Sequence, residues 1–387
     1  MKRLQNAAGN IYFGLTDSTQ YLQSITVILI DMKKILLTIS LFTLPLIILA
    51  QYKVSGIVVD EKTQQPLAGA SVFCQNTTIG TLTNSNGEFS IYVPSGGYDI
   101  VVSYTGFETQ SQRISKQTEN IEALKFVLKE KEKSLEEVAV VATTEVRNGL
   151  EKYGDFFKEH FIGITENSAL CEIENPQVLR FFYSKKKNRL KIISDQDIII
   201  NNKALGYRIR YQLDSFVHDY GTTITQFTGY PLFEEMQGTE SETENWKLKR
   251  EEAYLGSLTH FLKSYYDKTL GSEGFKLEFI DKAGKLRPLN DPYDTTFALL
   301  ENEELELRPL SKLRVAYLNE LPEKGYLVKN KLSLNNTIQI SQLDFRDAIV
   351  VERNGYFYDQ RDLLTIGYWG WEKFADFMPY DYLPANK

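Results

Sequence analysis

The chain has 387 residues, enough for two or three domains, and 42% of them are apolar, so most of it can bury folded cores. It carries 44 Lys and Arg against 51 Asp and Glu, a net charge of −7, which argues against a nucleic-acid partner because phosphate contacts need a basic face. Two cysteines are too few for a disulfide framework or a four-cysteine zinc site.

The N-terminal region predicts export. Two lysines precede an uncharged run over residues 35–50, which is too short for a relaxed membrane span and typical of a signal-peptide core, with Ala50 at the expected cleavage point. We therefore expect residues 32–50 to be a signal peptide, translation to start at Met32, and residues 1–31 to lie upstream of the true start. An uncleaved anchor is the alternative. The protein is expected in the periplasm, or associated with the outer membrane or cell surface.

Residues 51–129 have the pattern of a small β-sandwich. Short runs rich in β-branched and aromatic side chains are separated by turn signals at regular spacing. One such turn is Asn86-Gly87, a pair that suits the positive φ angles of a tight hairpin. We predict a mainly β chain that begins with a seven-stranded, Ig-like or prealbumin-like sandwich.

Several motifs of this region stand in a characteristic order. They are Gly56–Asp60, Pro66–Val72, Thr83 with Gly87–Ile91, and Tyr98 with Gly106-Phe107. Together they resemble the carboxypeptidase regulatory-like domain, a transthyretin-like, Ig-like sandwich with a carbohydrate-binding-like fold. The resemblance implies a non-catalytic module, because in the metallocarboxypeptidases this domain follows the catalytic one.

The sequence lacks the metal-binding motif of a zinc carboxypeptidase. Such a site needs a His-x-x-Glu pair and a further histidine. None of the three histidines begins that motif; they are His160, His218 and His260. We therefore predict a protein that is not an enzyme and has no catalytic residues, metal or cofactor.

Residues 130–147 predict a charged linker with a short apolar strand over residues 135–142. This strand resembles the segment that joins the same domain to the plug of TonB-dependent receptors in Bacteroidetes-type outer membranes. Such a receptor also needs a plug and a large barrel, and the roughly 260 residues that follow the sandwich are too few for both. The resemblance therefore indicates that the protein is located where such receptors are found, and not that it is itself a receptor.

Residues 148–387 predict an α+β, β-rich domain of unknown function with one long helix. An amphipathic helix is expected over residues 148–163, and several strands follow it. In the strand over residues 207–216, apolar and polar side chains alternate, which indicates that one face is buried and the other is exposed to solvent. Asn245 is the expected cap of the long helix, which runs to about Leu270.

Polar residues of the expected long helix form one candidate site. Arg250, Ser257 and His260 would line the cleft of a hydrolase. The nucleophile-elbow pattern Gly-x-Ser-x-Gly is missing around Ser257. Residues three apart on a helix are neighbours in any case, so a structural, hydrogen-bonded His260 is the preferred interpretation.

The aromatic C-terminal segment gives a second candidate surface. Trp369 and Trp371 belong to a run of aromatic side chains that either stacks on sugar rings or docks the tail onto its own domain. Docking is the preferred interpretation. Cys74 and Cys171 allow a cross-domain disulfide in an oxidising envelope, but two separately buried thiols are preferred.

Motifs of the second domain also resemble a known group. They are Phe161–Gly163, Asn175-Pro176, Leu205–Tyr207, Arg250 with Ala253–Ser257, and Gly367–Trp369. They resemble a family of exported Bacteroidetes proteins that pair a carboxypeptidase regulatory-like domain with an uncharacterised C-terminal region. The resemblance implies an envelope location and supplies no activity.

These observations predict a non-catalytic cell-envelope protein. Its first domain is expected to act as an interaction module, accessory to outer-membrane, TonB-dependent uptake, with an outer-membrane or periplasmic protein, a glycan, or both as partner. Two alternatives stay open. One is a hydrolase with its site near Arg250, Ser257 and His260. The other is a small outer-membrane barrel over residues 178–358, which the charged helix at residues 247–252 disfavours because it interrupts an even strand pattern.

Overall fold

The computed structural model describes residues 51–115, 118–131, 145–281, 283–308, 312–358 and 360–384. Residues 51–387 form one compact unit. The expected signal peptide and the strand at 135–142 lie outside the described residues. Among the residues described, none of the helices combines the length and the apolar character that a membrane crossing requires.

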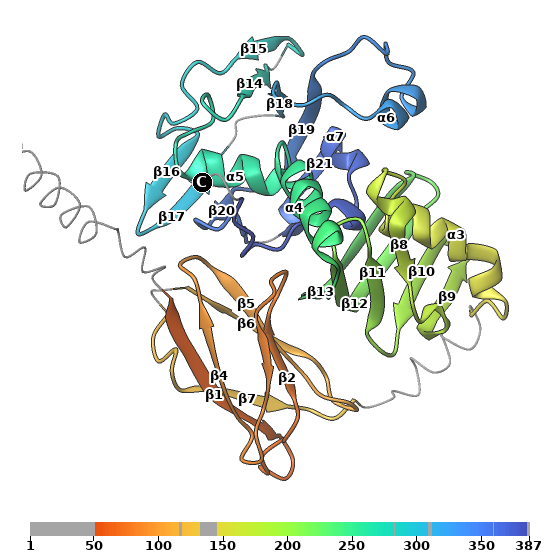
Figure 1. Ribbon diagram of the computed structural model, residues 1–387, viewed down its shortest axis with the longest axis vertical. Helices are drawn as coiled ribbons and strands as arrows, with labels where there is room; N and C mark the ends of the chain where they lie inside the picture. The colour runs from red at the N-terminus through yellow and green to blue at the C-terminus, as the bar shows by residue number, and fades with distance from the viewer. Residues whose placement is uncertain are drawn as a thin grey trace, which may run out of the picture. The chain divides into compact units, whose positions relative to one another are not determined.

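The first part of the described chain is a two-sheet sandwich (Figure 1). One sheet has the order β4-β1-β7 and the other has the order β3-β2-β5-β6. Strands β1 and β7 are parallel, and the other neighbouring strands are antiparallel. Both sheets send apolar side chains into one core, which confirms the predicted seven-stranded sandwich. The strands are β1 (Tyr52–Asp60), β2 (Ser71–Cys74), β3 (Gly80–Leu82), β4 (Glu88–Val93), β5 (Tyr98–Ser103), β6 (Gln110–Ile114) and β7 (Leu124–Leu128).

A third sheet, with six strands, is covered on one face by the helix α3 (Gly149–Phe161) (Figure 1). Its order is β8-β11-β12-β10-β9, and β13 also pairs with β12. Phe157 and Phe161 of α3 are fully buried against it, and β12 alternates buried and partly exposed residues as its sequence predicts. The strands are β8 (Cys171–Ile173), β9 (Leu179–Ser184), β10 (Arg189–Ser194), β11 (Ile198–Asn202), β12 (Tyr207–Asp219) and β13 (Ile224–Glu235), with the 3-10 turns η1 (Asn167–Leu170) and η2 (Pro176–Val178) between them.

The remaining strands form a five-stranded sheet, β15-β14-β18-β19-β21, and a small sheet, β16-β17-β20. The strands of residues 178–358 are thus divided among three sheets. The elements are β14 (Phe275–Ile280), β15 (Leu286–Pro288), β16 (Ala298–Glu301), β17 (Glu304–Leu307), β18 (Leu313–Tyr317), α6 (Lys324–Lys329), β19 (Gln339–Phe345), β20 (Ile349–Val351), η3 (Gln360–Asp362), β21 (Leu363–Gly367), α7 (Tyr368–Trp371) and η4 (Phe374–Asp376).

The prediction of a single long helix over residues 245–270 is wrong, because the chain forms two helices in this region. The helix α4 (Glu240–Tyr254) begins earlier than predicted: Thr239, not Asn245, caps it in a reciprocal capping box with Glu242. It ends because Gly256 has a φ of +76°, a left-handed conformation that breaks the helix. The helix α5 (Leu258–Tyr266) then starts in a new direction.

The sandwich is joined to the rest of the compact unit through the turn after β2. The Asn76 N–H donates to the Pro231 carbonyl at 2.8 Å, and the Phe233 N–H donates to the Thr77 carbonyl at 2.9 Å. From the C-terminal tail, the Tyr380 N–H donates to the Asn76 carbonyl at 2.8 Å. An apolar cluster of Phe73, Val101 and Leu232 lies at the same junction.

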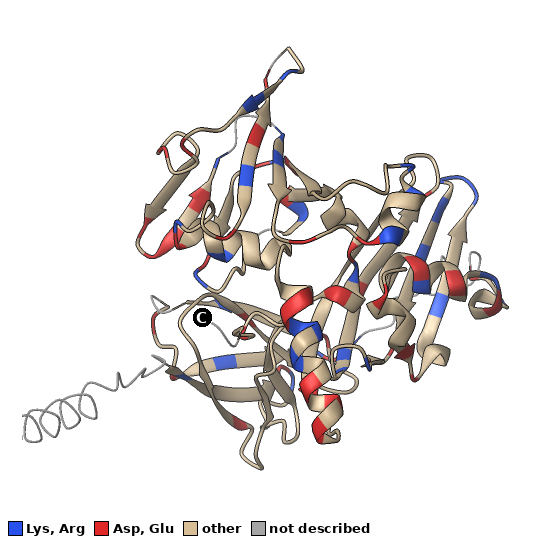
Figure 2. Ribbon diagram, turned by 45° about the horizontal axis from the view of Figure 1, so that its top comes forward, with Lys and Arg blue, Asp and Glu red and all other residues tan. Residues whose placement is uncertain are grey.

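Charged side chains of both signs are interspersed over the helices and strands (Figure 2). Most ion pairs among the described residues join partly exposed side chains, such as Arg180 with Glu145 at 2.9 Å. Surface pairs of this kind contribute little to stability. The core contacts, rather than these pairs, therefore hold the fold together.

Candidate functional site

Arg250 is a structural anchor of α4. Its Nε donates to the Leu205 carbonyl at 2.7 Å and its Nη2 to the Gly206 carbonyl at 3.2 Å, while Nη1 lies 2.9 Å from a Glu235 carboxylate oxygen. The guanidinium also lies 4.0 Å from the centre of the Tyr207 ring. These contacts occupy both edges and one face of the Arg250 guanidinium. They fix α4 against the turn between β11 and β12.

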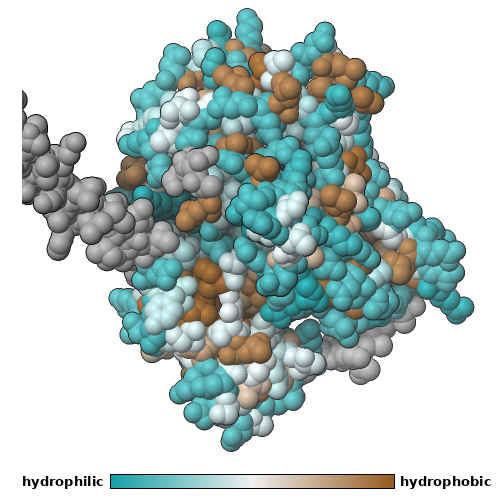
Figure 3. Space-filling model, in the orientation of Figure 1, coloured by the Kyte–Doolittle hydropathy of each residue, from teal (hydrophilic) through white to brown (hydrophobic). Residues whose placement is uncertain are grey.

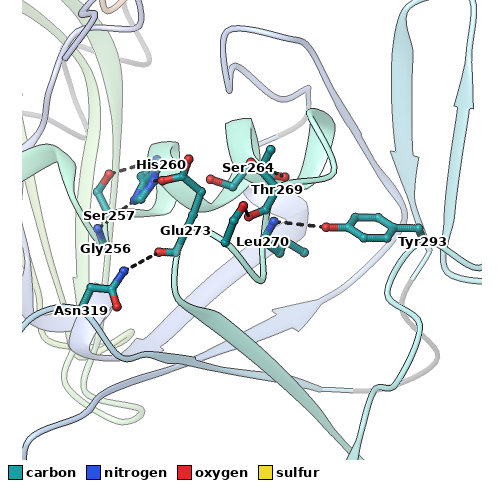
Figure 4. A network of polar contacts seen from close by, with 10 residues as sticks. Gly256, Ser257, His260, Ser264, Thr269, Leu270, Glu273, Tyr293 and Asn319 are labelled. Carbon is teal, nitrogen blue, oxygen red and sulfur yellow. Dashed lines mark hydrogen bonds and ion pairs between the residues drawn. The ribbon is translucent and has the colours of Figure 1, made fainter. Parts of the chain in front are cut away.

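His260 lies at the start of α5 and is fully buried. Its Nδ1 accepts a hydrogen bond from the Gly256 N–H at 3.1 Å, so Nε2 carries the proton and donates to Glu273 at 3.1 Å (Figure 4). Ser257 is the N-cap of α5, and its Oγ accepts from the backbone N–H of His260. A general base must direct a free lone pair at its nucleophile, and the Nδ1 lone pair of His260 is already used by an amide.

The two candidate tryptophans do not form an exposed surface. Trp369 and Trp371 are both buried, which corrects their prediction as part of a functional surface. The indole N–H of Trp369 donates to the Gly256 carbonyl at 2.6 Å, and that of Trp371 donates to Glu323 at 3.0 Å. Their rings dock the C-terminal tail onto the domain, as the preferred interpretation expected.

The five predicted residues are therefore brought together only in part. Ser257, His260 and Trp369 meet around the backbone of Gly256, where they hold the turn between α4 and α5. Arg250 contacts a different turn, and Trp371 packs in a separate cluster with Tyr326. These contacts account for all five residues as structural groups.

Cys74 and Cys171 are both buried and not disulfide-bonded. Burial raises the pKa of the Cys171 thiol to about 12, and burial also raises the pKa of Cys74. A thiol with a raised pKa is a poor nucleophile, because the thiolate is the reactive form. The two cysteines behave as the separately buried core residues that were preferred.

A cavity of about 480 Å³ lies where the sandwich meets the C-terminal region. We call it the junction cavity. The sandwich contributes residues from the end of β2 and from β5 and β6, and the C-terminal region contributes β13 and the segment around η3. The lining residues are Gln75, Asp99, Arg113, Thr228, Tyr356, Phe357, Gln360, Arg361 and Asp362.

The wall of the junction cavity is fixed by a close approach of two turns. Asn354 Nδ2 donates to the Gly97 carbonyl at 2.9 Å. A Cβ atom at Gly96, whose φ is +142°, would lie 2.6 Å from the Asn354 side chain, so only glycine permits this contact. The turn before β5 therefore fits against the turn that follows β20.

Polar contacts orient side chains that line the junction cavity or lie beside it. The buried hydroxyl of Tyr356 donates to Asp99 at 2.8 Å. The Arg113 guanidinium lies 3.7 Å from the centre of the Tyr358 ring and 3.9 Å from Asp99. Burial raises the pKa of Glu352, which accepts a short hydrogen bond from the Tyr358 hydroxyl. The wall thus presents fixed donors, acceptors and ring faces.

This arrangement suits non-covalent binding of a polar ligand. The lining residues offer two guanidinium groups, two carboxylates and two primary amides, beside two aromatic rings. Neither a histidine nor a cysteine is among the described lining residues. Within the part of the chain that the structure describes, groups of three or more His, Cys, Asp or Glu placed to hold a metal ion are also absent.

Sequence reasoning missed the junction cavity. Its residues come from five segments between Gln75 and Asp362, and none of them belongs to a recognisable motif. Asn354-Gly355 is a residue pair typical of a tight turn, and Gly355 has a φ of +80°. Its partner in the sandwich could not be read from local sequence.

Comparison with known proteins identifies the first domain. Residues 54–140 match the model of the CarboxypepD_reg-like domain, so the chain contains a domain of this family. The chain is also 34% identical over 97 residues to the TonB-dependent receptor SusC of Bacteroides thetaiotaomicron, a match that covers 25% of this chain and 9% of the receptor. The relation is consistent with a Bacteroidetes-type protein and weakly indicates association with the cell envelope.

Comparison with solved structures adds little to the identification of the first domain. A 3-chlorocatechol 1,2-dioxygenase from Rhodococcus opacus is 12% identical over 21% of this chain and 60% of its own, with a TM-score of 0.17. A DUF3823 family protein from Bacteroides ovatus is 8% identical over 49% of this chain and 82% of its own, also with a TM-score of 0.17. Similarities at this level carry no argument about function.

Proposed function

We propose that the chain is a non-catalytic cell-envelope protein whose CarboxypepD_reg-like domain acts as a binding module, accessory to TonB-dependent uptake at the outer membrane. The similarity to SusC is the observation that carries this proposal. Because the match spans only 9% of the receptor, the receptor's transport activity is not part of it. What the two proteins share is a stretch of 97 residues.

The junction cavity is the proposed ligand site, and a glycan is the ligand class that its chemistry favours. Sugar hydroxyls pair well with planar carboxylate, amide and guanidinium groups, which Asp99, Gln75 and Arg361 supply. The apolar face of a sugar ring packs on aromatic rings, which Tyr356 and Phe357 supply. The volume of about 480 Å³ is within the range of small-ligand sites.

A non-catalytic role is supported by the geometry around His260. Its Nδ1 is occupied by the Gly256 amide, and its ring is fully buried. We therefore expect the His260→Gln variant, if it folds, to show the same binding and no loss of any turnover. A hydrolytic activity that disappears in this variant would contradict the proposal.

The direct test is calorimetric titration of residues 51–387 with neutral and acidic oligosaccharides. We expect binding of at least one class, weakened about tenfold or more by Arg361→Ala, because each hydrogen bond to a charged group contributes roughly 1.5–3 kcal/mol. Arg361 is exposed, so the variant should fold. Arg287→Ala, which removes an exposed arginine of β15, is the matched control and should bind normally.

A partner search tests the envelope role separately. Residues 51–387 would be used to capture proteins from solubilised envelopes, with identification by mass spectrometry. Enrichment of an outer-membrane transporter supports an accessory role in uptake. Capture of cytoplasmic proteins alone, together with no glycan binding, would contradict the proposed function.

A further inference from the structure

The segment between β18 and β19 exposes an unusual number of large apolar side chains. We call residues 318–338, which include α6, the α6 segment. Leu321, Val328 and Leu334 are each 66% exposed, and Leu318 and Leu332 are exposed as well. Figure 3 shows apolar surface gathered where Figure 1 places α6. Apolar side chains that cluster on a surface in this way mark an interaction site more often than scattered single ones do.

The α6 segment is anchored by its inner face. Tyr326 and Leu327 are buried in a cluster with Tyr368 and Trp371, and the Tyr326 ring lies 5.0 Å from the Tyr368 ring. The Leu332 N–H closes the turn after the helix by donating to the Leu327 carbonyl at 2.8 Å. The outward side chains are therefore held in place on a fixed support, and they are not needed for the core.

The basic and acidic residues of the α6 segment differ in their exposure to solvent. Lys324, Lys329 and Lys331 are exposed. The two acidic residues are partly buried instead: Glu320 accepts from Gln339 at 3.0 Å, and Glu323 accepts from the Trp371 indole at 3.0 Å. Lys329 also lies 2.9 Å from Glu159, an ion pair in which both side chains are about half exposed. The outer face consequently combines apolar and cationic groups.

We propose that the α6 segment docks the protein on an anionic lipid surface. Leu321, Val328 and Leu334 enter the boundary between headgroups and acyl chains, while Lys324 and Lys331 contact lipid phosphates. Apolar side chains with flanking lysines are the combination that binds such an interface, because burial and charge attraction add. The exposed lysines of the α6 segment complement anionic headgroups, whereas two copies that met through this segment would bring lysines of like charge together.

The test is flotation of residues 51–387 with lipid vesicles. This part of the chain is used because it is a compact unit containing the cores described above, and an apolar leader would add membrane affinity of its own. Vesicles of phosphatidylglycerol and phosphatidylethanolamine are compared with vesicles of phosphatidylcholine alone. We expect binding to the anionic vesicles, at least tenfold weaker binding to the neutral ones, and weakening by added salt.

Two pairs of variants locate the binding surface. Val328→Ser with Leu334→Ser should reduce binding to anionic vesicles at least tenfold. Leu82→Ser with Leu248→Ser is the matched control, because these two leucines are 61% and 66% exposed elsewhere, and it should bind like the parent protein. Circular dichroism and the melting temperature check that both variants fold.

A charge-reversal pair tests the lysines. Lys324→Glu with Lys331→Glu should abolish the preference for anionic vesicles, whereas Lys186→Glu with Lys187→Glu, in the exposed turn between β9 and β10, should leave it unchanged. Equal loss in both pairs would contradict a specific surface. Absence of vesicle binding by the parent protein would overturn the proposal, and so would a dimer in sedimentation velocity that the Val328 and Leu334 variant abolishes.

Discussion

At the scale of single residues, one backbone amide decides what His260 does. The Gly256 N–H occupies Nδ1, and Glu273 receives the proton of Nε2, so the ring links the turn between α4 and α5 to the segment before β14. Trp369 closes the same turn from the other side by donating to the Gly256 carbonyl. A serine and a histidine three residues apart thus form a cap and a brace instead of a nucleophile and its base.

Gly256 should be among the least replaceable residues. In a Gly256→Ala variant, the new Cβ would lie 2.6 Å from the Tyr317 ring, and the φ of +76° is unfavourable for alanine. We expect a loss of about 2–4 kcal/mol in the free energy of unfolding, from the left-handed backbone and the overpacking together. Urea unfolding followed by tryptophan fluorescence measures it.

Gly271→Ala is the control for Gly256→Ala. Nothing lies within 4 Å of a Cβ atom built at Gly271, and its φ is outside the left-handed region. We expect a change of less than about 0.5 kcal/mol there, as for other surface substitutions. Similar losses in the two variants would contradict the packing argument.

Asp376 should make stability depend on pH. Burial raises the pKa of Asp376 to about 7, although Asn167 and Thr165 donate to its carboxylate. The folded state therefore holds this proton more tightly than the unfolded state does. Its stabilising effect is complete below pH 4 and is lost as the pH rises to about 7.

The pH dependence is tested with Asp376→Asn. We expect the free energy of unfolding of the parent protein to fall more steeply between about pH 4 and about pH 7 than that of the variant. Contributions from other groups, such as Glu320, whose pKa burial also raises to about 7, are common to both proteins and cancel in the comparison. Asp155→Asn, on the exposed side of α3, should retain the parent slope. An unchanged slope in Asp376→Asn would contradict the assignment.

At the scale of elements, the ends of the helices depend on caps that periodicity does not reveal. We predicted one helix where the chain forms α4 and α5, because apolar residues continue at helical spacing across Gly256. The chain breaks there because the glycine conformation and the new cap at Ser257 start a second helix. The start of α4 was misplaced for a related reason, since Thr239 and Glu242 form a capping box several residues upstream of Asn245.

The capping box of α4 gives a prediction at this scale. Thr239→Ala removes the side-chain acceptor of the Glu242 N–H, and we expect a loss of roughly 1 kcal/mol in the free energy of unfolding. Trp246, which is buried on α4, provides a fluorescence signal near the change. Ser241→Ala, in the same exposed first turn, is the control and should have little effect; an equal loss there would show that the cap is not responsible.

At the scale of the whole molecule, the turn after β2 couples the sandwich to the rest of the compact unit. Backbone hydrogen bonds from Asn76 and Thr77 reach β13, and the Thr78 N–H and hydroxyl donate to Asp381 in the C-terminal tail. Phe73, Val101 and Leu232 exclude water beside them. The junction cavity exists only because these contacts bring its two walls together.

Leu232→Ala should weaken this coupling. We expect a single thermal transition for residues 51–387 and, in the variant, a loss of about 2–4 kcal/mol as the cluster opens a cavity. Differential scanning calorimetry measures both. Leu248→Ala, which truncates a leucine that is 66% exposed, is the control and should leave the transition unchanged. Two well-separated transitions in the parent protein would contradict the coupling.

Local patterns determined several elements in advance. The strands and turns of the sandwich, the helix α3 and the alternating faces of β12 follow from apolar spacing and turn residues, because each of these signals acts over a few neighbouring positions. The short strands β8, β15, β16 and β17 were missed, since three or four residues carry too little pattern to be recognised.

The sequence by itself determined the seven-stranded domain, its family resemblance and the mainly β character of the chain. Only the tertiary structure decided that His260 and Trp369 brace a turn, that Trp371 is buried, and that Asp99, Arg113 and Tyr356 meet in one cavity. The physical reason is the range of the interactions. Periodicity and turn chemistry are local, whereas burial and the partners of a polar group depend on segments that are hundreds of residues apart in the chain.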